Sequence, residues 1–195
     1  FRRVLFRSLQ LSVPVFCHKG NKNVLIRDAK ISYEKQGRWI SKHLKSIELN
    51  YYKSVSFKIL FPEIEKVLKS KPETIFQLDF QLLNLLLNYL NIGTKIIVAS
   101  EMGISGKKND DLMLSILSKT GSNELLLGMG ASTSYVNRQF IMDKGFKLLF
   151  LKFEHPVYKQ KSKNFVKGIS SLDLLMNCSQ KEASDIVRNS GNIKT

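Results

Sequence analysis

Cysteine is scarce in this chain of 195 residues, which contains only Cys17 and Cys178. Two cysteines so far apart form neither a disulfide framework nor a zinc-binding pattern. The three histidines include no pair with the spacing of metal ligands. We therefore expect no metal, no cofactor, and a reducing compartment such as the cytoplasm.

Long hydrophobic runs are also absent. The most apolar stretch, residues 76–90, is interrupted by polar side chains at Gln77, Asp79, Gln81, Asn84 and Asn88. A helix that spans a bilayer needs about 20 predominantly apolar residues, so we expect no membrane span. The chain length suits one globular domain with a core of its own.

Acidic residues are few, 16 against 31 lysines and arginines, and the formal net charge is +15. Three of the arginines lie in residues 1–8, FRRVLFRS, and one back-translation of this peptide looks like a common sequencing adapter. We interpret residues 1–8 as an artefact and exclude them, which lowers the charge to +12 and leaves a domain at residues 9–195. The remaining charge is uniform and rich in lysine, so it indicates no specific nucleic-acid partner.

The first half of the chain predicts two strands followed by helices. Residues 11–34 alternate in part around the turn sequence GNKN and contain Pro14, which suits a strand edge. Residues 39–49 carry apolar side chains at positions 40, 44 and 47, a helical stripe. We expect a second helix to start at Pro62, and a largely buried third helix to run from Pro72 to Gly93.

The second half predicts a βαβαβ arrangement. The expected strands are residues 94–100, 123–130 and 146–154. A helix capped by Asn109 or Asp110 lies between the first two, and residues 133–145 form the next helix, with Gly121 and Gly145 as helix ends. Two short helices follow, one at residues 172–176 and one from Ser179. This order predicts a single α/β domain, with a mixed or parallel sheet, right-handed crossovers and flanking helices.

Ligands usually bind beyond the carboxyl ends of parallel strands, and three predicted loops lie there. Residues 100–110, which begin with Ser100, and residues 128–134 offer glycines, hydroxyls or lysines before a helix. They could receive an anion, or they could be ordinary loop sequence. Neither matches a P-loop.

The third loop, residues 154–165, carries more chemistry. His155 follows a predicted strand, with Glu154, Tyr158 and Gln160 nearby. Lysines surround it at positions 152, 159, 161, 163 and 167. A histidine with an orienting carboxylate could act as a general base, and the lysines could hold a phosphate-bearing substrate. The alternative is a turn histidine in a solvated, lysine-rich loop.

Other candidates favour structural roles. Cys17 and His18 are adjacent and would face opposite sides of a strand, and Cys178 follows an apolar helix and should pack. His43 lies four residues after Trp39 on one helix face, so packing is favoured over a ligand role.

Four stretches together resemble the WbqC-like protein family: RWISKHLKSIELNYYKSVSF, TKIIVASEM, HPVYKQ and SSLDLLMN. The resemblance runs from about Leu11 to Asn189. Its motifs match here at Trp39, His43, Ser100, His155, Pro156, Tyr158, Gln160, Ser170, Asp173 and Asn177. The chain departs from the family pattern at residues 54–56 and 110–111, and it lacks the N-terminal motif that members usually carry.

The family is associated with bacterial surface-polysaccharide loci such as those for O-antigen. The resemblance, together with the polar loop and its lysines, implies a cytoplasmic transferase of lipopolysaccharide biosynthesis. It would act on a nucleotide-linked amino sugar, by acyl or aminoacyl transfer to the amine. His155 would accept the proton, and Asp173 or Glu154 would orient it. Substrate contacts would come from Tyr158, Gln160, Ser100, Lys159, Asn177, Trp39 and His43. The alternative is a non-catalytic protein of the same pathway that binds a sugar precursor or acts as a scaffold.

Overall fold

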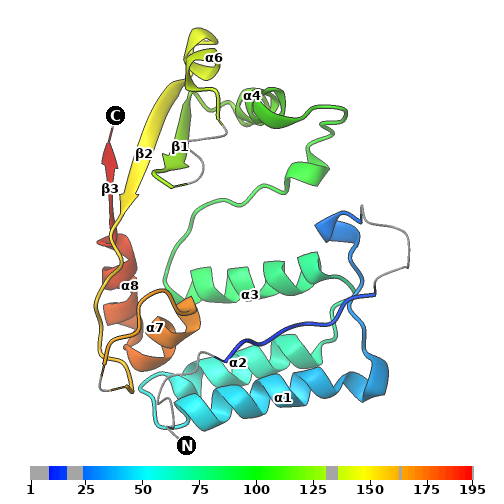
Figure 1. The fold of residues 1–195 in the computed structure, drawn as a ribbon, viewed down its shortest axis with the longest axis vertical. Helices are drawn as coiled ribbons and strands as arrows, with labels where there is room; N and C mark the ends of the chain where they lie inside the picture. Colours follow the sequence, from blue (N-terminus) through cyan, green and yellow to red (C-terminus); the bar gives the residue numbers. More distant parts are fainter. Residues whose placement is uncertain (1–8, 17–23, 131–135, 163, 195) are drawn as a thin grey trace, which may run out of the picture. The chain divides into compact units, whose positions relative to one another are not determined.

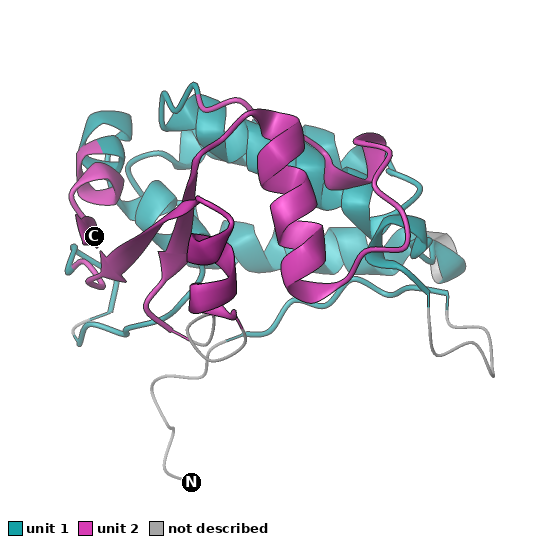
Figure 2. Ribbon diagram, turned by 90° about the horizontal axis from the view of Figure 1, so that it is seen from above, with its two compact units in different colours: residues 1–93, 157–184 teal, residues 94–156, 185–195 magenta. Residues whose placement is uncertain are grey.

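The computed structural model describes residues 9–16, 24–130, 136–162 and 164–194 (Figure 1). The chain divides into two compact units, shown in different colours in Figure 2. Unit 1 comprises Phe1–Gly93 and Val157–Ser184, and unit 2 comprises Thr94–Pro156 and Asp185–Thr195. The two units are interleaved in sequence, because the chain passes from one to the other three times. The assignment of residues 9–195 to one domain stays a prediction, and residues 1–8 lie outside the described ranges.

Unit 1 is helical. Its elements are η1 (Ile26–Asp28), α1 (Glu34–Tyr51), α2 (Phe57–Lys69), α3 (Ile75–Tyr89), α7 (Ser171–Asn177) and most of α8 (Gln180–Arg188). The stripe predicted at residues 39–49 is confirmed, because Ile40, Leu44 and Ile47 of α1 are buried. Leu60, Ile64 and Leu68 bury the matching face of α2, so both helices pack through residues spaced three or four apart.

The predicted start of α2 at Pro62 is wrong. The helix begins at Phe57, and Pro62 lies inside it. The buried Ser56 fixes the earlier start: its N–H donates to the Met176 carbonyl at 3.1 Å, and its hydroxyl donates to the Cys178 carbonyl at 2.7 Å. Tertiary contacts therefore override the preference of proline for a first helical position.

The boundaries of α3 also differ from the prediction. The helix begins at Ile75 rather than Pro72, because Thr74 and Gln77 form a reciprocal capping box. It ends before Gly93, since Asn91 adopts the left-handed conformation with φ 52° and the Ile92 N–H bonds the Leu87 carbonyl. The helix is only partly buried, and Leu83 is 43 % exposed. Its expected burial on most sides is wrong.

The two strands expected within residues 11–34 are not formed among the described residues. Val15 and Ile31 make a single antiparallel bridge, and Lys30 makes another with Thr74. Residues 26–28 form a 3₁₀ turn instead. The GNKN turn, residues 20–23, lies outside the described ranges. An extended pair this short gains too few ladder hydrogen bonds to become a sheet.

Unit 2 contains a three-stranded mixed sheet of order β1-β2-β3. β1 (Glu124–Gly128) pairs in parallel with β2 (Lys147–Phe153), and β3 (Gly191–Lys194) pairs antiparallel with β2. α6 (Arg138–Asp143) connects the parallel strands, so β1, α6 and β2 form a βαβ unit, as predicted. Leu127, Val136, Ile141 and Leu148 form the core of the unit, and Met113, Leu114, Phe140 and Phe150 pack against it. The α/β class and the mixed sheet are therefore confirmed.

Two details of unit 2 differ from the prediction. Residues 94–98 form no strand, and Ala99–Glu101 form the 3₁₀ turn η2. Ile96 and Ile97 stay 36 % and 46 % exposed, because no described strand pairs with them. The strand β3 was missed, since GNIK has no apolar alternation long enough to signal it.

The remaining helices agree largely with the sequence pattern. α4 (Asn109–Thr120) ends at Gly121 with φ 65°, as predicted. Its N-cap is Lys108 without a side-chain cap bond, so the predicted capping by Asn109 or Asp110 is wrong. The two short C-terminal helices are α7 and α8, and the Ser179 hydroxyl and Glu182 carboxylate form the cap of α8. Among the described helices, none is both long and apolar enough to cross a membrane.

Candidate functional site

A buried carboxylate and two tyrosines form a connected polar cluster in unit 1. Asp173, in the first turn of α7, is only 7 % exposed. Its Oδ1 accepts a hydrogen bond from the Tyr51 hydroxyl at 2.9 Å, and its Oδ2 accepts one from the Tyr158 hydroxyl at 3.0 Å. We call Asp173, Tyr51, Tyr158 and Gln160 the carboxylate–tyrosine cluster.

Gln160 connects this cluster to the loop that follows. Its amide nitrogen donates to the Tyr158 hydroxyl at 3.3 Å and to the Val166 carbonyl at 3.0 Å. Its amide oxygen accepts from the Val166 N–H at 2.7 Å. The Phe165 ring meets the Tyr158 ring edge-on, with centroids 5.4 Å apart. The Gln160 side chain therefore holds the loop together by binding the backbone of Val166, six residues later.

Both tyrosines of the cluster are held in the protonated state. Burial, together with the nearby Asp173 carboxylate, raises the pKa of Tyr158 to about 12, although the hydrogen bond from Gln160 opposes the shift. Burial and the Asp173 carboxylate also raise the pKa of Tyr51. Protonated phenols donate to a carboxylate, so the cluster satisfies a buried acid with neutral donors. This arrangement favours a structural role for the cluster over a role as a general base.

Asn177 and Ser54 extend the same network. The Asn177 amide donates to the Asp173 carbonyl at 2.9 Å, and the Ser54 hydroxyl donates to the Asn177 amide oxygen at 3.2 Å. Ser54 lies where the chain departs from the family pattern, and neither it nor Tyr51 was predicted from the sequence. The signal for Tyr51 was its position within the motif stretch RWISKHLKSIELNYYKSVSF.

His155 lies in unit 2, immediately beyond β2. The Glu154 N–H bonds the Ser190 carbonyl at 2.8 Å and so holds the chain at the strand end. The His155 Nδ1 lies 3.0 Å from the Pro156 carbonyl oxygen, and the ring meets Phe153 edge-on at 6.0 Å. A carbonyl only accepts, so Nδ1 carries the hydrogen. In the neutral ring, Nε2 then carries the lone pair, as a general base requires.

An open hollow of about 400 Å³ adjoins this ring. It is lined by Glu154, His155, Pro156, Asp185, Ile186, Asn189 and Ser190. The charged lining residues are both acidic, so the hollow favours a cationic group. The Glu154 carboxylate lies 2.8 Å from the Lys152 ammonium, and this hydrogen-bonded pair lowers the Glu154 pKa. Glu154 therefore stays ionised at neutral pH.

A family model confirms the resemblance of the motifs. The model described as the WbqC-like protein family matches residues 3–185. The chain belongs to the WbqC-like family. No curated protein and no solved structure matches the chain.

In this WbqC-like protein the predicted site residues fall into separate groups. Tyr158, Gln160, Asp173 and Asn177 come together in unit 1, whereas His155 and Glu154 lie in unit 2. The side-chain partners of Asp173 are the two tyrosines, and Glu154 pairs with Lys152. The roles of Asp173 and Glu154 in orienting His155 therefore stay predictions.

Trp39 and His43 lie in the interior of unit 1, and each is 8 % exposed. Their rings meet edge-on at 5.1 Å, and the His43 Nε2 lies 3.2 Å from the Ser12 carbonyl oxygen. Burial lowers the pKa of His43, although the Ser12 contact opposes the shift. This environment favours packing by both residues in the WbqC-like fold over contact with a substrate.

The remaining candidate residues lie outside the carboxylate–tyrosine cluster and the His155 hollow. Ser100 is exposed in η2, and Lys159 is exposed after the Tyr158 turn. Lys161 donates to the Asn50 carbonyl at 3.1 Å and lies over the Tyr52 ring. Cys178 is buried, and this burial raises the pKa of its thiol.

Some predictions cannot be placed. Cys17, His18 and residues 131–134 of the second glycine-containing loop lie outside the described ranges. Across the residues that the structure describes, no group of three or more His, Cys, Asp and Glu side chains is arranged to hold a metal ion.

Proposed function

We propose that this WbqC-like protein acts in bacterial surface-polysaccharide biosynthesis of the O-antigen type. It transfers an acyl or aminoacyl group to the amine of a nucleotide-linked amino sugar. The observation that carries the proposal is the position of His155, a histidine with Nδ1–H oriented by a carbonyl, beside a hollow with two acidic residues. The proposal places the protein in the cytoplasm.

The residues of the hollow support the amine as the acceptor. A sugar amine is protonated in neutral water, and Asp185 would attract the ammonium group, whereas Glu154 is already paired with Lys152. His155 would accept its proton as a general base. The nitrogen lone pair then forms the C–N bond. The bond to the leaving group of the acyl donor breaks, and the leaving group takes the proton from His155. The imidazole, neutral again, then takes the second proton from the nitrogen and releases it to water.

Mass spectrometry of nucleotide sugars tests the proposal. The protein is incubated with nucleotide-linked amino sugars and an activated acyl or aminoacyl donor, and the mass of the acylated sugar is followed. His155→Gln should reduce the rate by about a hundredfold or more, because general-base catalysis contributes on that order. Gln139→Ala, an exposed change in the same unit, is the matched control and should leave the rate unchanged.

Two outcomes would contradict the proposal. Product formation by His155→Gln at the original rate would remove His155 from the chemistry. Binding of the nucleotide sugar without any change of mass, across the donors tested, would favour a non-catalytic precursor-binding or scaffold protein of the same pathway.

A further inference from the structure

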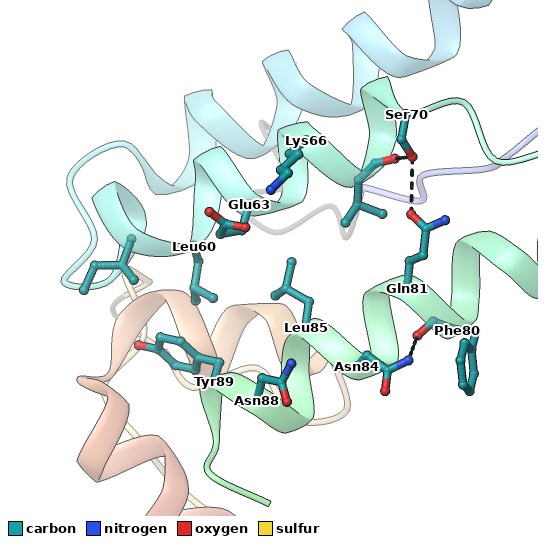
Figure 3. Close-up of a pocket in the computed structure, with 12 residues that line it drawn as sticks. Leu60, Glu63, Lys66, Ser70, Phe80, Gln81, Asn84, Leu85, Asn88 and Tyr89 are labelled. Atoms are coloured by element: carbon teal, nitrogen blue, oxygen red, sulfur yellow. Dashed lines mark hydrogen bonds between the residues drawn. The ribbon is translucent and has the colours of Figure 1, made fainter. Parts of the chain in front are cut away.

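A groove runs between α2 and α3 in unit 1, with a volume of about 660 Å³ (Figure 3). Its lining residues come from both helices: Ile59, Leu60, Glu63, Lys66, Val67, Ser70, Phe80, Gln81, Asn84, Leu85, Asn88 and Tyr89. None of them takes part in the carboxylate–tyrosine cluster or lines the His155 hollow. The volume lies in the range of pockets that hold small molecules.

The polar side chains of the groove form two rows. On α2 the row is Glu63, Lys66 and Ser70, and on α3 it is Gln81, Asn84 and Asn88. Both rows follow a spacing of three and then four residues, which places each row along one helix face. Hydrogen-bonding groups therefore border the groove on both sides over about two helical turns.

Apolar side chains form the floor between these rows. Leu60 is only 2 % exposed and Tyr89 is 8 % exposed. Figure 3 shows Leu60 and Leu85 between the two helices. The Tyr89 hydroxyl donates to Ser56 at 2.7 Å, so that hydroxyl is engaged away from α2's polar row.

Part of the polar surface of the groove is preorganised. The Ser70 hydroxyl donates to the Val67 carbonyl at 2.8 Å, and its oxygen lies 3.3 Å from the Gln81 amide oxygen of the other helix. The Asn84 amide donates to the Phe80 carbonyl at 2.8 Å. This bond uses one of the two amide hydrogens of Asn84 and so fixes the direction of its second amide hydrogen and its amide oxygen. Rigid polar groups lose less conformational entropy when they bind.

We propose that this groove binds a neutral oligosaccharide. Sugar hydroxyls both donate and accept hydrogen bonds, and the amides of Gln81, Asn84 and Asn88 do the same. The C–H faces of sugar rings would pack on the apolar floor. The inference depends on residues of unit 1 alone and does not rest on the proposed transfer reaction.

Other ligand classes fit the groove less well. Glu63 and Lys66 balance each other in charge, so the groove selects against a polyanion. An acyl chain would remove the two polar rows from water without offering them partners, which is costly. A neutral polyol satisfies both rows and the floor at once.

Methyl NMR of the whole protein tests the proposal, with maltotriose and chitotriose as the probes. Either sugar at millimolar concentration should shift the methyl signals of Leu60, Val67 and Leu85. Asn88→Ala and Glu63→Ala remove exposed groups, so both variants should fold. Each should weaken binding about fivefold, the effect of losing one hydrogen bond. Asn50→Ala and Glu65→Ala are matched controls outside the groove and should bind like the original chain.

Three results would overturn the proposal. The first is the absence of shifts at these methyls with both sugars. The second is equal weakening by the control and groove variants, which would indicate binding elsewhere. The third is a shift of the groove methyls by dodecanoate but by neither sugar, which would identify an apolar ligand site. Each result is independent of whether the protein acylates a nucleotide sugar.

Discussion

Asp173 shows how a single buried carboxylate can be accommodated by neutral hydrogen-bond donors. Its two oxygens accept from Tyr51 and Tyr158, at 2.9 Å and 3.0 Å. Hydrogen bonds to a charged acceptor are stronger than those between neutral groups. An acidic side chain in the first turn of a helix also interacts favourably with the helix dipole. Loss of this one carboxylate should therefore affect the whole cluster.

Asp173→Asn should lower the free energy of unfolding of unit 1. An amide has one accepting oxygen, so one buried tyrosine hydroxyl loses its acceptor, at a cost of about 1–3 kcal/mol. Urea unfolding followed by the fluorescence of Trp39, the single tryptophan, reports on the same unit. Asp79→Asn, at an exposed position of α3, is the control. Equal unfolding midpoints for the two variants would show that the hydrogen bonds of the tyrosines to the Asp173 carboxylate add nothing to the free energy of unfolding.

Tyr158 makes unit 1 less stable in strong alkali. Its pKa is raised to about 12 in the folded chain, whereas an unfolded tyrosine titrates near ~10. As the pH rises above ~10 the unfolded chain releases the proton first, so the free energy of unfolding falls between the two pKa values. Below pH ~10 this residue adds no pH dependence. Urea midpoints measured by circular dichroism should fall over this range, and less steeply in Tyr158→Phe. Parallel curves for the two chains would refute the assignment.

Three of the four residues of the cluster were candidates from the sequence, but their contacts were not predicted. Tyr158, Gln160 and Asp173 belong to the motifs HPVYKQ and SSLDLLMN, so the family resemblance identified them. Tyr51 and Asp173 are 122 positions apart, and helical or strand periodicity carries no information at that separation. His43 illustrates the opposite case: its spacing from Trp39 favoured packing over a ligand role, and the structure brings the two rings together at 5.1 Å.

At the scale of elements, the loop after His155 owes its shape to side chains rather than to regular structure. Gln160 bonds the backbone of Val166 through both ends of its amide. Tyr158 fixes the start of the loop on Asp173. Side-chain bonds of this kind replace the backbone ladder that helices and strands would supply.

Gln160→Ala should open this loop to proteases. The variant removes both bonds to Val166, so the exposed Lys159 and Lys161 should become accessible in an extended conformation. Limited proteolysis with trypsin, with the fragments identified by mass spectrometry, should show faster cleavage after these lysines. Gln139→Ala, an exposed change in α6, should leave the rate unchanged. Unaltered cleavage in Gln160→Ala would mean that other contacts hold the loop.

Elements with a local signal were predicted, and elements that depend on partners were not. β1, β2 and α6 follow from apolar runs and from Gly121 and Gly145, which end helices with positive φ. Residues 94–98 have the composition of a buried strand, but they gain no ladder without a neighbouring strand. The start of α2 depends on the contacts of Ser56 with residues 176 and 178. The preference of proline for the first position of a helix is weaker than the two hydrogen bonds of the buried Ser56.

At the scale of the whole molecule, the excess of cations is the main electrostatic feature. The chain has 31 lysines and arginines and only 16 acidic residues. Several of those acids are already paired on the surface, as Glu65 is with Lys69 and Glu124 with Lys147. The unpaired lysines give a positive field without a defined binding module. Such a field attracts any polyanion at low ionic strength.

Binding to nucleic acid should therefore be weak, independent of sequence and lost at moderate salt. Each phosphate that a lysine neutralises releases a counterion, so log K should fall with log[salt] by about 0.9 per contact. Fluorescence anisotropy with two duplexes of unrelated sequence, between ~50 and ~200 mM salt, measures both properties. We expect equal affinity for the two duplexes at each salt concentration. Tight binding to only one duplex at the higher salt would require base contacts, and it would contradict the view that the charge is generic.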